Sequence, residues 1–430
     1  MTDLLVRGGR LVDPAAGRDG NFDVALREGT VLAVGERLSA DGAEVLDARG
    51  LLVFPGFIDL HAHLREPGQE YAETIASGSG AAAAGGFTAV CAMPNTNPVN
   101  DGRTVTAFVA ARALLAGGAR VYPIGAITRG RRGEELAEFG EMRSSGAVAV
   151  SDDGDWLSDG DLLRRAIEHA ALFGMAVVQH GEDRSLSRRA PMHEGAVSTR
   201  LGLAGQPDVA EAAAVVRDLL IARLAGGRLH FAHLSTALAV DSVREAKARG
   251  SSVTCEVTPH HLTLTDDEIA RSGYSTRFKM NPPLRGRADV AALVDALADG
   301  TIDAIATDHA PHHDDEKEVE FDAAPFGVVG LETAAAVVFD RLVAPGRLSL
   351  ARYAELFSAG PARAFGLPGG TLAPGSPADV TLFDPRRRWT VDPTQFVSLG
   401  RSTPFAGWEL VGAPAATVVG GRVVWRRESA

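Results

Sequence analysis

The amino-acid sequence predicts an α/β protein, a (β/α)8 TIM barrel with a small β-sandwich domain that both chain ends form together. Two observations carry this prediction. The middle of the chain alternates apolar strand-like segments with Ala-rich amphipathic segments, and both ends contain only short strands separated by Gly and Asp turns. A third observation is that His and Asp residues follow several of the central strands, where a barrel has its functional face.

The chain ends lack helical periodicity of useful length. Strand-like runs occur in order at residues 4–7, 22–26, 31–34 and 51–54, and again at 378–383, 416–419 and 422–425. The pair Gly420-Gly421 between the last two runs predicts a hairpin. Since neither end is long enough to bury a core alone, we expect one composite domain of residues 1–54 and 366–430. Residues 55–365 then form the barrel.

The central segment contains eight strand candidates. They are Phe57–His61, Phe87–Ala92, Arg120–Gly125, Ala147–Ser151, Ala176–His180, Leu229–His233, Val253–Val257 and Ile302–Ala306. Amphipathic segments such as 107–115 and 161–172 separate most of them. This alternation is typical of a (β/α)8 barrel. A doubly wound open sheet is the alternative, but it would more naturally carry a Gly-rich fingerprint after its first strand, and none is found.

Composition narrows the possible partners. The chain has 430 residues, of which 45% are hydrophobic and 23% charged, with a net charge of −12. No basic patch stands out to neutralise phosphates, so we expect no nucleic acid partner. An anionic substrate would need a local positive site. No run approaches the roughly 18 apolar residues of a membrane span, and the N-terminus lacks the apolar stretch of a signal peptide.

The two cysteines, Cys91 and Cys255, lie far apart in apolar strand-like runs. We expect buried free thiols rather than a disulfide, which fits a reducing, cytoplasmic setting.

The motif His61-Ala62-His63 ends the first central strand. Residues two apart in a strand point to the same side, so the two imidazoles can bind one metal ion. Arg65 is the next residue on that face and can hold an anionic group beside the metal. A single His-x-His pair is a weak signal, because such histidines are more often packing or surface residues.

Four more residues of ligand type follow later strands. Asp153 comes after the fourth, His180 ends the fifth, His233 ends the sixth and Asp308 follows the eighth. All lie at the carboxyl ends of barrel strands, where they would meet. Imidazole and carboxylate ligands without thiolates suit zinc. Six ligands exceed the need of one tetrahedral ion, so we expect two zinc ions that share a carboxylate and a hydroxide.

These residues resemble the amidohydrolase superfamily, whose barrels are metal-dependent hydrolases. Further motifs resemble bacterial class I dihydroorotases over nearly all of the chain. They are His61-Ala62-His63-Leu64-Arg65-Glu66-Pro67-Gly68, Met93-Pro94-Asn95-Thr96-Asn97-Pro98, Ser151-Asp152-Asp153-Gly154, Asn281-Pro282-Pro283-Leu284-Arg285, Thr307-Asp308-His309-Ala310-Pro311-His312, Ala324-Pro325-Phe326-Gly327 and Gly330-Leu331-Glu332-Thr333. The resemblance implies zinc-dependent, reversible cyclisation of N-carbamoyl-L-aspartate to dihydroorotate in pyrimidine biosynthesis.

The lysines separate this group from related enzymes. Hydantoinases, dihydropyrimidinases and allantoinases bridge their metals with a carbamylated lysine on the fourth strand. The lysines of this chain are Lys247, Lys279 and Lys317, none of them near that strand. The resemblance therefore implies that Asp153 bridges the metals. Whether both metal positions are filled stays open, because aspartate is shorter than a carbamylated lysine.

The chemistry and the resemblance together imply roles for single residues. Asp308, beside the attacking hydroxide, can take its proton and deliver it to the leaving nitrogen. His63 also borders the substrate. The resemblance assigns Arg65, Asn95 and His312 to the substrate carboxylate, and Asn281 with the backbone of Phe326-Gly327 to the ring amides. The segment 313–325 is a candidate lid. Site roles for Asp152, His260 and His261 carry less weight.

Two other functions stay open. One is a hydantoinase- or allantoinase-like hydrolase of another cyclic amide. The other is a non-catalytic dihydroorotase-like partner of aspartate carbamoyltransferase, although such chains typically lose the metal histidines. We also expect a homodimer from the family resemblance, and a complex with aspartate carbamoyltransferase is possible for an active enzyme.

Overall fold

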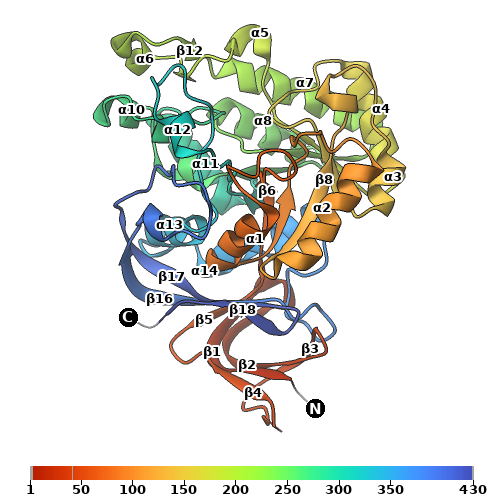
Figure 1. Ribbon diagram of the computed structural model, residues 1–430, viewed down its shortest axis with the longest axis vertical. Coiled ribbons are helices and arrows are strands. Elements are labelled where there is room, and N and C mark those ends of the chain that lie inside the picture. Colours follow the sequence, from red (N-terminus) through yellow and green to blue (C-terminus); the bar gives the residue numbers. More distant parts are fainter. Residues whose placement is uncertain (1–2, 41, 429–430) are drawn as a thin grey trace.

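The computed structural model describes residues 3–40 and 42–428 and contains the predicted barrel (Figure 1). Eight parallel strands follow one another in the order β15-β14-β13-β10-β9-β8-β7-β6. The strands are β6 (Phe57–Ala62), β7 (Phe87–Ala92), β8 (Arg120–Gly125), β9 (Ala149–Ser151), β10 (Ala176–Gln179), β13 (Arg228–Phe231), β14 (Thr254–Val257) and β15 (Ala304–Ile305). A parallel bridge between Ala62 and His309 joins the first strand to the segment after the last. The barrel, and not the open-sheet alternative, is therefore the correct fold.

Helices cover the outside of the barrel between successive strands (Figure 1). The longer ones are α1 (Ile75–Ala84), α2 (Arg103–Ala116), α3 (Phe139–Ser144), α4 (Gly160–Ala171), α7 (Val209–Ala225), α8 (Ala237–Ala248), α11 (Arg287–Asp299), α14 (Leu350–Phe357) and α15 (Ala359–Phe365). Among the described residues, no helix combines the length and the apolar character needed to cross a bilayer.

Short elements decorate the carboxyl end of the barrel. They are α5 (Arg184–Ser187), β11 (Met192–His193), α6 (Ala196–Leu201), β12 (Gly205–Gln206), α9 (Pro259–Thr263), α10 (Asp267–Arg271) and α12 (Asp314–Lys317). Helix α13 (Ala334–Val338) instead packs against β17 (Glu409–Val419) of the sheet formed by the chain ends (Figure 1). These short elements cannot be predicted from the sequence, because two to six residues carry too little periodicity.

Both chain ends form one eight-stranded sheet of order β18-β17-β16-β5-β1-β2-β3, in which β4 pairs with β1. Its strands are β1 (Leu4–Asp13), β2 (Arg18–Arg27), β3 (Thr30–Gly35), β4 (Glu44–Asp47), β5 (Leu52–Pro55), β16 (Val380–Thr390), β17 (Glu409–Val419) and β18 (Arg422–Arg426). The predicted hairpin at Gly420-Gly421 joins β17 to antiparallel β18. The sheet closes over an apolar cluster that includes Val6, Val24, Val380 and Val418. We propose domain boundaries at residues 54/55, one residue before the end of β5, and at residues 365/366, directly after α15.

Aromatic side chains join the sheet to the amino end of the barrel. Phe54 of β5 packs against Phe57 of β6 with ring centroids 5.3 Å apart, and Phe57 packs against Phe357 of α14 at 5.1 Å. Phe383 of β16 lies 6.5 Å from Phe54. This cluster fixes the start of β6, the strand that carries the His61-Ala62-His63 motif at its other end.

Candidate active site

All six predicted metal ligands lie at the carboxyl end of the barrel. His61 is in β6 and His63 follows it, whereas Asp153, His180, His233 and Asp308 follow β9, β10, β13 and β15. Each ligand is buried, with at most 7% of its surface exposed. Parallel strands end at one face, so ligands separated by up to 247 positions in sequence meet there.

The Asp153 carboxylate lies at the centre of the imidazoles. Its Oδ1 is 3.4 Å from Nε2 of His61, 3.6 Å from Nδ1 of His180 and 3.5 Å from Nε2 of His233. Its Oδ2 is 3.5 Å from Nε2 of His63. One carboxylate thus faces four imidazoles through its two oxygens, the arrangement needed for a carboxylate shared by two ions.

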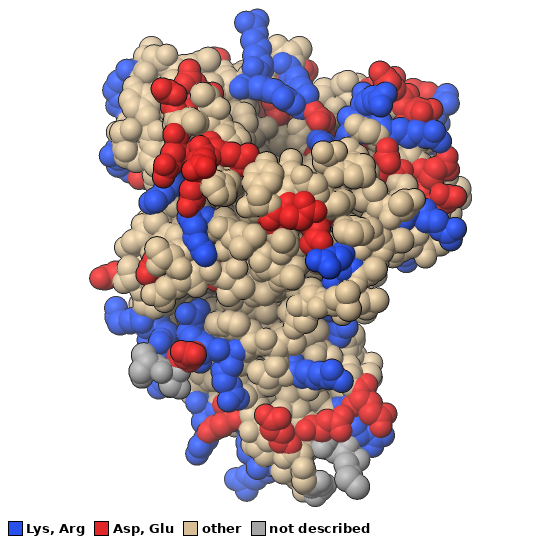
Figure 2. Space-filling view, in the orientation of Figure 1, with Lys and Arg blue, Asp and Glu red and all other residues tan. Residues whose placement is uncertain are grey.

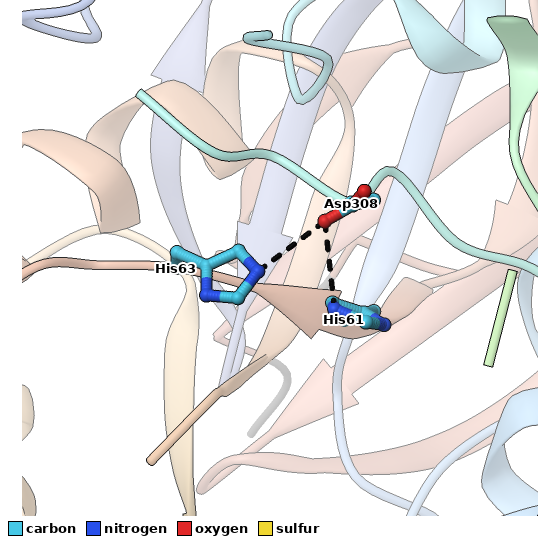
Figure 3. A group of neighbouring side chains, drawn as sticks. All are labelled: His61, His63 and Asp308. Carbon is cyan, nitrogen blue, oxygen red and sulfur yellow. Dashed lines mark ion pairs between the residues drawn. The ribbon is translucent and has the colours of Figure 1, made fainter. Parts of the chain in front are cut away.

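Asp308 faces the His61-Ala62-His63 pair from the neighbouring segment after β15 (Figure 3). Its Oδ1 lies 3.5 Å from Nε2 of His61 and 3.3 Å from Nε2 of His63. In the described chain, two groups of donor atoms are compact enough to hold a metal, namely His61, His63 and Asp308, and His61, Asp153 and His233. His61 belongs to both groups.

The donor atoms fit a cation. Nε2 of His61 and Oδ1 of Asp153 are buried, yet neither has a hydrogen-bond partner in the described chain. Buried polar atoms are normally satisfied, so an unsatisfied imidazole nitrogen facing an unsatisfied carboxylate oxygen calls for an additional group between them. Imidazole nitrogen and carboxylate oxygen are ligands that zinc accepts.

Burial and the neighbouring charges shift the pKa values of this cluster in opposite directions. Burial lowers the pKa of His61, but the carboxylates of Asp153 and Asp308 raise it well above its ordinary value. Burial raises the pKa of Asp308, whereas the hydrogen bond from His63 and the positive charge of His61 hold it below its ordinary value. Asp308 is therefore ionised at neutral pH and can accept a proton or bind a cation.

Three of the predicted site residues have left-handed backbone. The φ angles are 61° at Arg65, 30° at His233 and 46° at Asp308. This conformation costs about 1 kcal/mol or more for a residue with a Cβ atom, and strain of this kind clusters at functional sites. The fold thus bends the chain against its local preference where these side chains face the cavity.

The ligands form one wall of a cavity of about 360 Å³. It is lined by all the predicted site residues except His61, together with Gly154, Arg189, Ala310 and Pro325. The predicted residues that line the cavity are His63, Arg65, Asn95, Asp153, His180, His233, Asn281, Asp308, His312, Phe326 and Gly327. Metal ligands and substrate candidates therefore share one space.

Arg65 and His312 lie on one side of the cavity. Nε of Arg65 donates to the Pro311 carbonyl at 3.0 Å, and its Nη2 lies 3.5 Å from Nε2 of His312. Nε2 of His312 also donates to the Phe326 carbonyl at 2.9 Å. The half-buried guanidinium thus lies beside the predicted metal ligands as a fixed positive charge.

The two asparagines contact the ligands rather than standing free. Nδ1 of His63 donates to Oδ1 of Asn95 at 2.8 Å. Nδ2 of Asn281 donates to Glu182 at 2.8 Å and lies 3.1 Å from Nε2 of His180. Both amides therefore orient imidazoles in this structure.

Gly327 completes the cavity wall because no other residue fits there. Its φ is 128°, and an added Cβ would approach the Ala310 carbonyl oxygen to 2.9 Å and Nε2 of His312 to 3.1 Å. A glycine therefore lets the backbone of residues 325–327 approach the cavity closely.

Several histidines and Asp152 serve structural contacts. Asp152 accepts the backbone N–H groups of Ile127 and Thr128 at 2.9 and 3.0 Å, so it orders the loop after β8. His309 turns away from the ligands toward Glu73, at 3.2 Å. His261 lies 2.9 Å from the Pro282 carbonyl, and buried His260 packs against it.

Sequence reasoning missed three residues at the site. Glu182 lies 3.0 Å from Nε2 of His180, and Glu256 lies 3.0 Å from Nδ1 of His61. Arg189 lines the cavity mouth. A two-residue spacing from His180 could have indicated Glu182, but no sequence signal relates Glu256 to His61, 195 positions away.

The visible molecular face mixes both signs of charge (Figure 2). Acidic side chains gather over α12, and a hollow near the top of the view is bordered by Lys or Arg side chains. Local positive charge is thus present near the carboxyl end of the barrel in a chain of net charge −12.

Comparisons with known proteins agree with this geometry. A dihydro-orotase-like family model matches residues 50–238, and an amidohydrolase family model matches residues 152–425. Among solved structures, an L-hydantoinase from Arthrobacter aurescens superposes with a TM-score of 0.87 at 28% identity, covering 100% of this chain and 97% of that one. A D-hydantoinase from a Thermus species gives a TM-score of 0.83 at 26% identity, covering 99% and 97%.

Curated relatives are much more similar in sequence. A dihydroorotase of Anaeromyxobacter dehalogenans strain 2CP-1 is 57% identical, with 100% of both chains covered. A dihydroorotase of Pelotomaculum thermopropionicum is 55% identical, with 98% of both chains covered. From this full-length identity, the chain belongs to the dihydroorotase family of the amidohydrolase superfamily.

Proposed function

We propose that this chain is a dihydroorotase, a cyclic amide hydrolase that interconverts N-carbamoyl-L-aspartate and dihydroorotate in pyrimidine biosynthesis. The full-length relatives named dihydroorotase support this activity. The structural observation that carries it is the position of Arg65, a half-buried cation in the same cavity as the ligand cluster. A guanidinium beside the reacting centre suits a ring that bears a carboxylate.

The proposed cofactor is zinc, two ions per chain. His61, His63 and Asp308 would hold one ion, His180 and His233 the other, and Asp153 would be shared. When bound, the metal activates a water molecule and polarises the substrate carbonyl. The buried, unsatisfied His61 Nε2 and Asp153 Oδ1 support this assignment.

Asp308 is the proposed proton carrier. It is ionised and lies at the cavity surface, so it can take a proton from the attacking water and deliver it to the ring nitrogen as the C–N bond breaks. In cyclisation the same carboxylate takes the proton from the carbamoyl nitrogen. One residue thus serves both directions, as microscopic reversibility requires.

The remaining lining residues are proposed to orient the ring. Arg65 and His312 would bind the substrate carboxylate together with Asn95, and His63 would border it. Asn281 and the Phe326-Gly327 backbone would contact the ring amides. For Asn95 and Asn281 this requires exchange of the amide contacts that they make with His63 and Glu182.

The hydantoinase alternative has less support. The two similar solved structures described above are hydantoinases, but their sequences are only 28% and 26% identical to this chain. Nζ of Lys317 binds the Pro325 and Gly327 carbonyls, and Nζ of Lys279 binds the Asp322 carbonyl. Lys247 pairs with Asp303. No described lysine lines the cavity to form a metal bridge.

The decisive experiment assays zinc-loaded protein with dihydroorotate, hydantoin and allantoin in parallel, with bound metal measured in the same samples. We expect turnover of dihydroorotate and zinc close to two ions per chain. Turnover of hydantoin or allantoin without dihydroorotate would contradict the proposal. Zinc near one ion per chain would remove only the second metal position.

Replacement of Asp308 tests the proton carrier. Asp308→Asn keeps the size of the side chain but removes its basicity, so kcat should fall by about 10²- to 10⁴-fold in both directions. Kinetics of ring opening and cyclisation, with circular dichroism to check the fold, would measure this. Near-parent activity of the folded variant would exclude Asp308 from proton transfer.

Location and assembly are further proposals. Cys91 and Cys255 are buried and unpaired, as the sequence predicts, which supports a reducing, cytoplasmic location. The family resemblance supports a homodimer and leaves room for a complex with aspartate carbamoyltransferase. Sedimentation of the chain alone and with that transferase would test both assemblies.

A further inference from the structure

A buried carboxylate of one barrel strand contacts a ligand of the candidate metal centre. Glu256 of β14 has 1% of its surface exposed. Its Oε1 lies 3.0 Å from Nδ1 of His61, and its Oε2 lies 3.1 Å from Nε2 of His230. Nδ1 of His230 lies 2.8 Å from Oγ1 of Thr254. Four polar side chains thus form a continuous line from the metal ligand into the barrel.

This line departs from the usual filling of a barrel. Bulky apolar side chains normally pack the interior in layers, and a buried carboxylate is costly unless it is fully paired. Here each carboxylate oxygen has one imidazole partner, and His230 also packs edge-on against Phe365 at 5.2 Å. Both Glu256 and His230 are therefore held in one orientation.

We propose that Glu256, supported by His230, is the positioning residue that fixes the orientation and tautomer of His61. A hydrogen bond from Nδ1–H of His61 to Glu256 directs Nε2 of the same ring toward Asp153 and Asp308, 3.4 and 3.5 Å away, where a bound metal ion would take the Nε2 lone pair. His61 is shared by both compact donor groups of the described chain. Rotation of this one ring would therefore disturb both proposed metal positions.

The role of His230 follows from the geometry of Glu256. Nε2–H of His230 donates to Oε2, and its Nδ1 accepts the Thr254 hydroxyl proton. This pair of contacts prevents the Glu256 carboxylate from turning away from His61. The inference rests on the metal centre of the proposed function, but not on the identity of the substrate.

The test is zinc affinity, measured by competition with a chromophoric chelator on metal-stripped protein. Glu256→Gln is almost the same size but a weaker acceptor, and Glu256→Leu removes the acceptor. We expect zinc to bind about tenfold more weakly to the first variant and up to about 100-fold more weakly to the second. His230→Phe should give a smaller loss, because Glu256 keeps its bond to His61.

Asp218→Asn is the matched control. Asp218 is a fully buried carboxylate, bonded to Nε1 of Trp156 at 3.0 Å and paired with Arg217 on α7, and none of these is a proposed ligand. Its variant should bind zinc as the parent does. Melting temperatures of the metal-free proteins report any loss of fold. If Glu256→Leu does not fold, Glu256→Gln carries the test.

Two outcomes would overturn the inference. One is parent-like zinc affinity in folded Glu256→Gln and Glu256→Leu. The other is an equal loss in Asp218→Asn, which would show a general effect of removing a buried carboxylate. Failure of the parent chain itself to bind zinc would overturn the metal centre of the proposed function as well, so the two failures are distinguishable.

Discussion

At the scale of the residue, the site depends on side chains placed by strained backbone. Arg65, His233 and Asp308 all have positive φ angles, which L-residues other than glycine rarely adopt. Such conformations persist only where the surroundings enforce them. At Arg65 the bond from Nε to the Pro311 carbonyl holds the side chain in the cavity. The charge is thus fixed before any substrate arrives.

Arg65 gives the prediction that belongs to this scale. Arg65→Met keeps an unbranched side chain but removes the charge and the donor fork. We expect kcat/KM for dihydroorotate to fall about 30- to 150-fold, from the loss of about 2–3 kcal/mol of charged hydrogen bonding. Steady-state kinetics with dihydroorotate would measure the change.

Arg112→Met is the control for this variant. Arg112 pairs at 2.6 Å with Glu66, the residue that follows Arg65 in the sequence. Arg112 itself does not line the cavity. Its kcat/KM should stay near that of the parent. A similar fall in both variants would mean that the loss comes from local disturbance and not from the carboxylate contact.

At the scale of the element, a buried lysine holds the cavity turn to α12. Nζ of Lys317 donates to the carbonyls of Pro325 and Gly327 at 2.9 and 2.8 Å. Oγ1 of Thr276 donates to the Lys317 carbonyl at 2.6 Å, which fixes the other side of the segment. The segment 313–325, a candidate lid from sequence, is thus fastened at its end next to Phe326.

Lys317 also makes stability depend on pH. Burial lowers the pKa of Lys317 to about 7, from an ordinary value of 10.5. Between these values the unfolded chain holds a proton that the folded chain has released, so the free energy of unfolding gains from this group as pH rises. The gain is complete above pH 10.5 and is lost as pH falls through 7.

Lys317→Met is the test. The free energy of unfolding of the parent, relative to this variant, should rise by about 1–2 kcal/mol between pH 7 and pH 9. Urea unfolding at both pH values would measure the difference, with all other titrating groups common to both proteins. A difference that is constant with pH would mean that Lys317 keeps its proton when folded.

At the scale of the whole molecule, the two chain ends are tied to each other and to the barrel. Asp13, at the end of β1, is fully buried and accepts the Leu372 N–H at 2.7 Å and the Thr371 hydroxyl at 2.9 Å. Its other oxygen accepts the Ala16 N–H at 3.1 Å. One carboxylate thus joins β1 to two residues that lie 358 and 359 positions later in the sequence.

Asp13→Ala should therefore destabilise the fold without touching the site. It leaves the buried Leu372 N–H without a partner, so we expect a loss of about 1–3 kcal/mol in the free energy of unfolding. Thermal unfolding would measure the loss, and zinc affinity should be unchanged. Unchanged stability would show that the seam between the chain ends does not need this carboxylate.

Much of this architecture could be predicted from the sequence because it is local. The eight barrel strands lie where apolar runs alternate with amphipathic segments, although β15 covers only Ala304–Ile305 of the predicted 302–306. Strand β4 was missed, because Glu44–Asp47 is a four-residue strand that is mostly exposed. Short, exposed strands have little apolar alternation to reveal them.

The types of ligand at the strand ends can be predicted from the sequence, because a parallel barrel brings those ends to one face. The side chains that fix these ligands and the neighbouring segments become apparent only when distant parts of the chain pack together. Glu256 reaches His61 across 195 positions, Lys317 reaches the cavity turn, and Asp13 reaches Leu372. These contacts depend on how distant segments pack, and no local pattern encodes a partner that only the folded chain brings within about 3 Å.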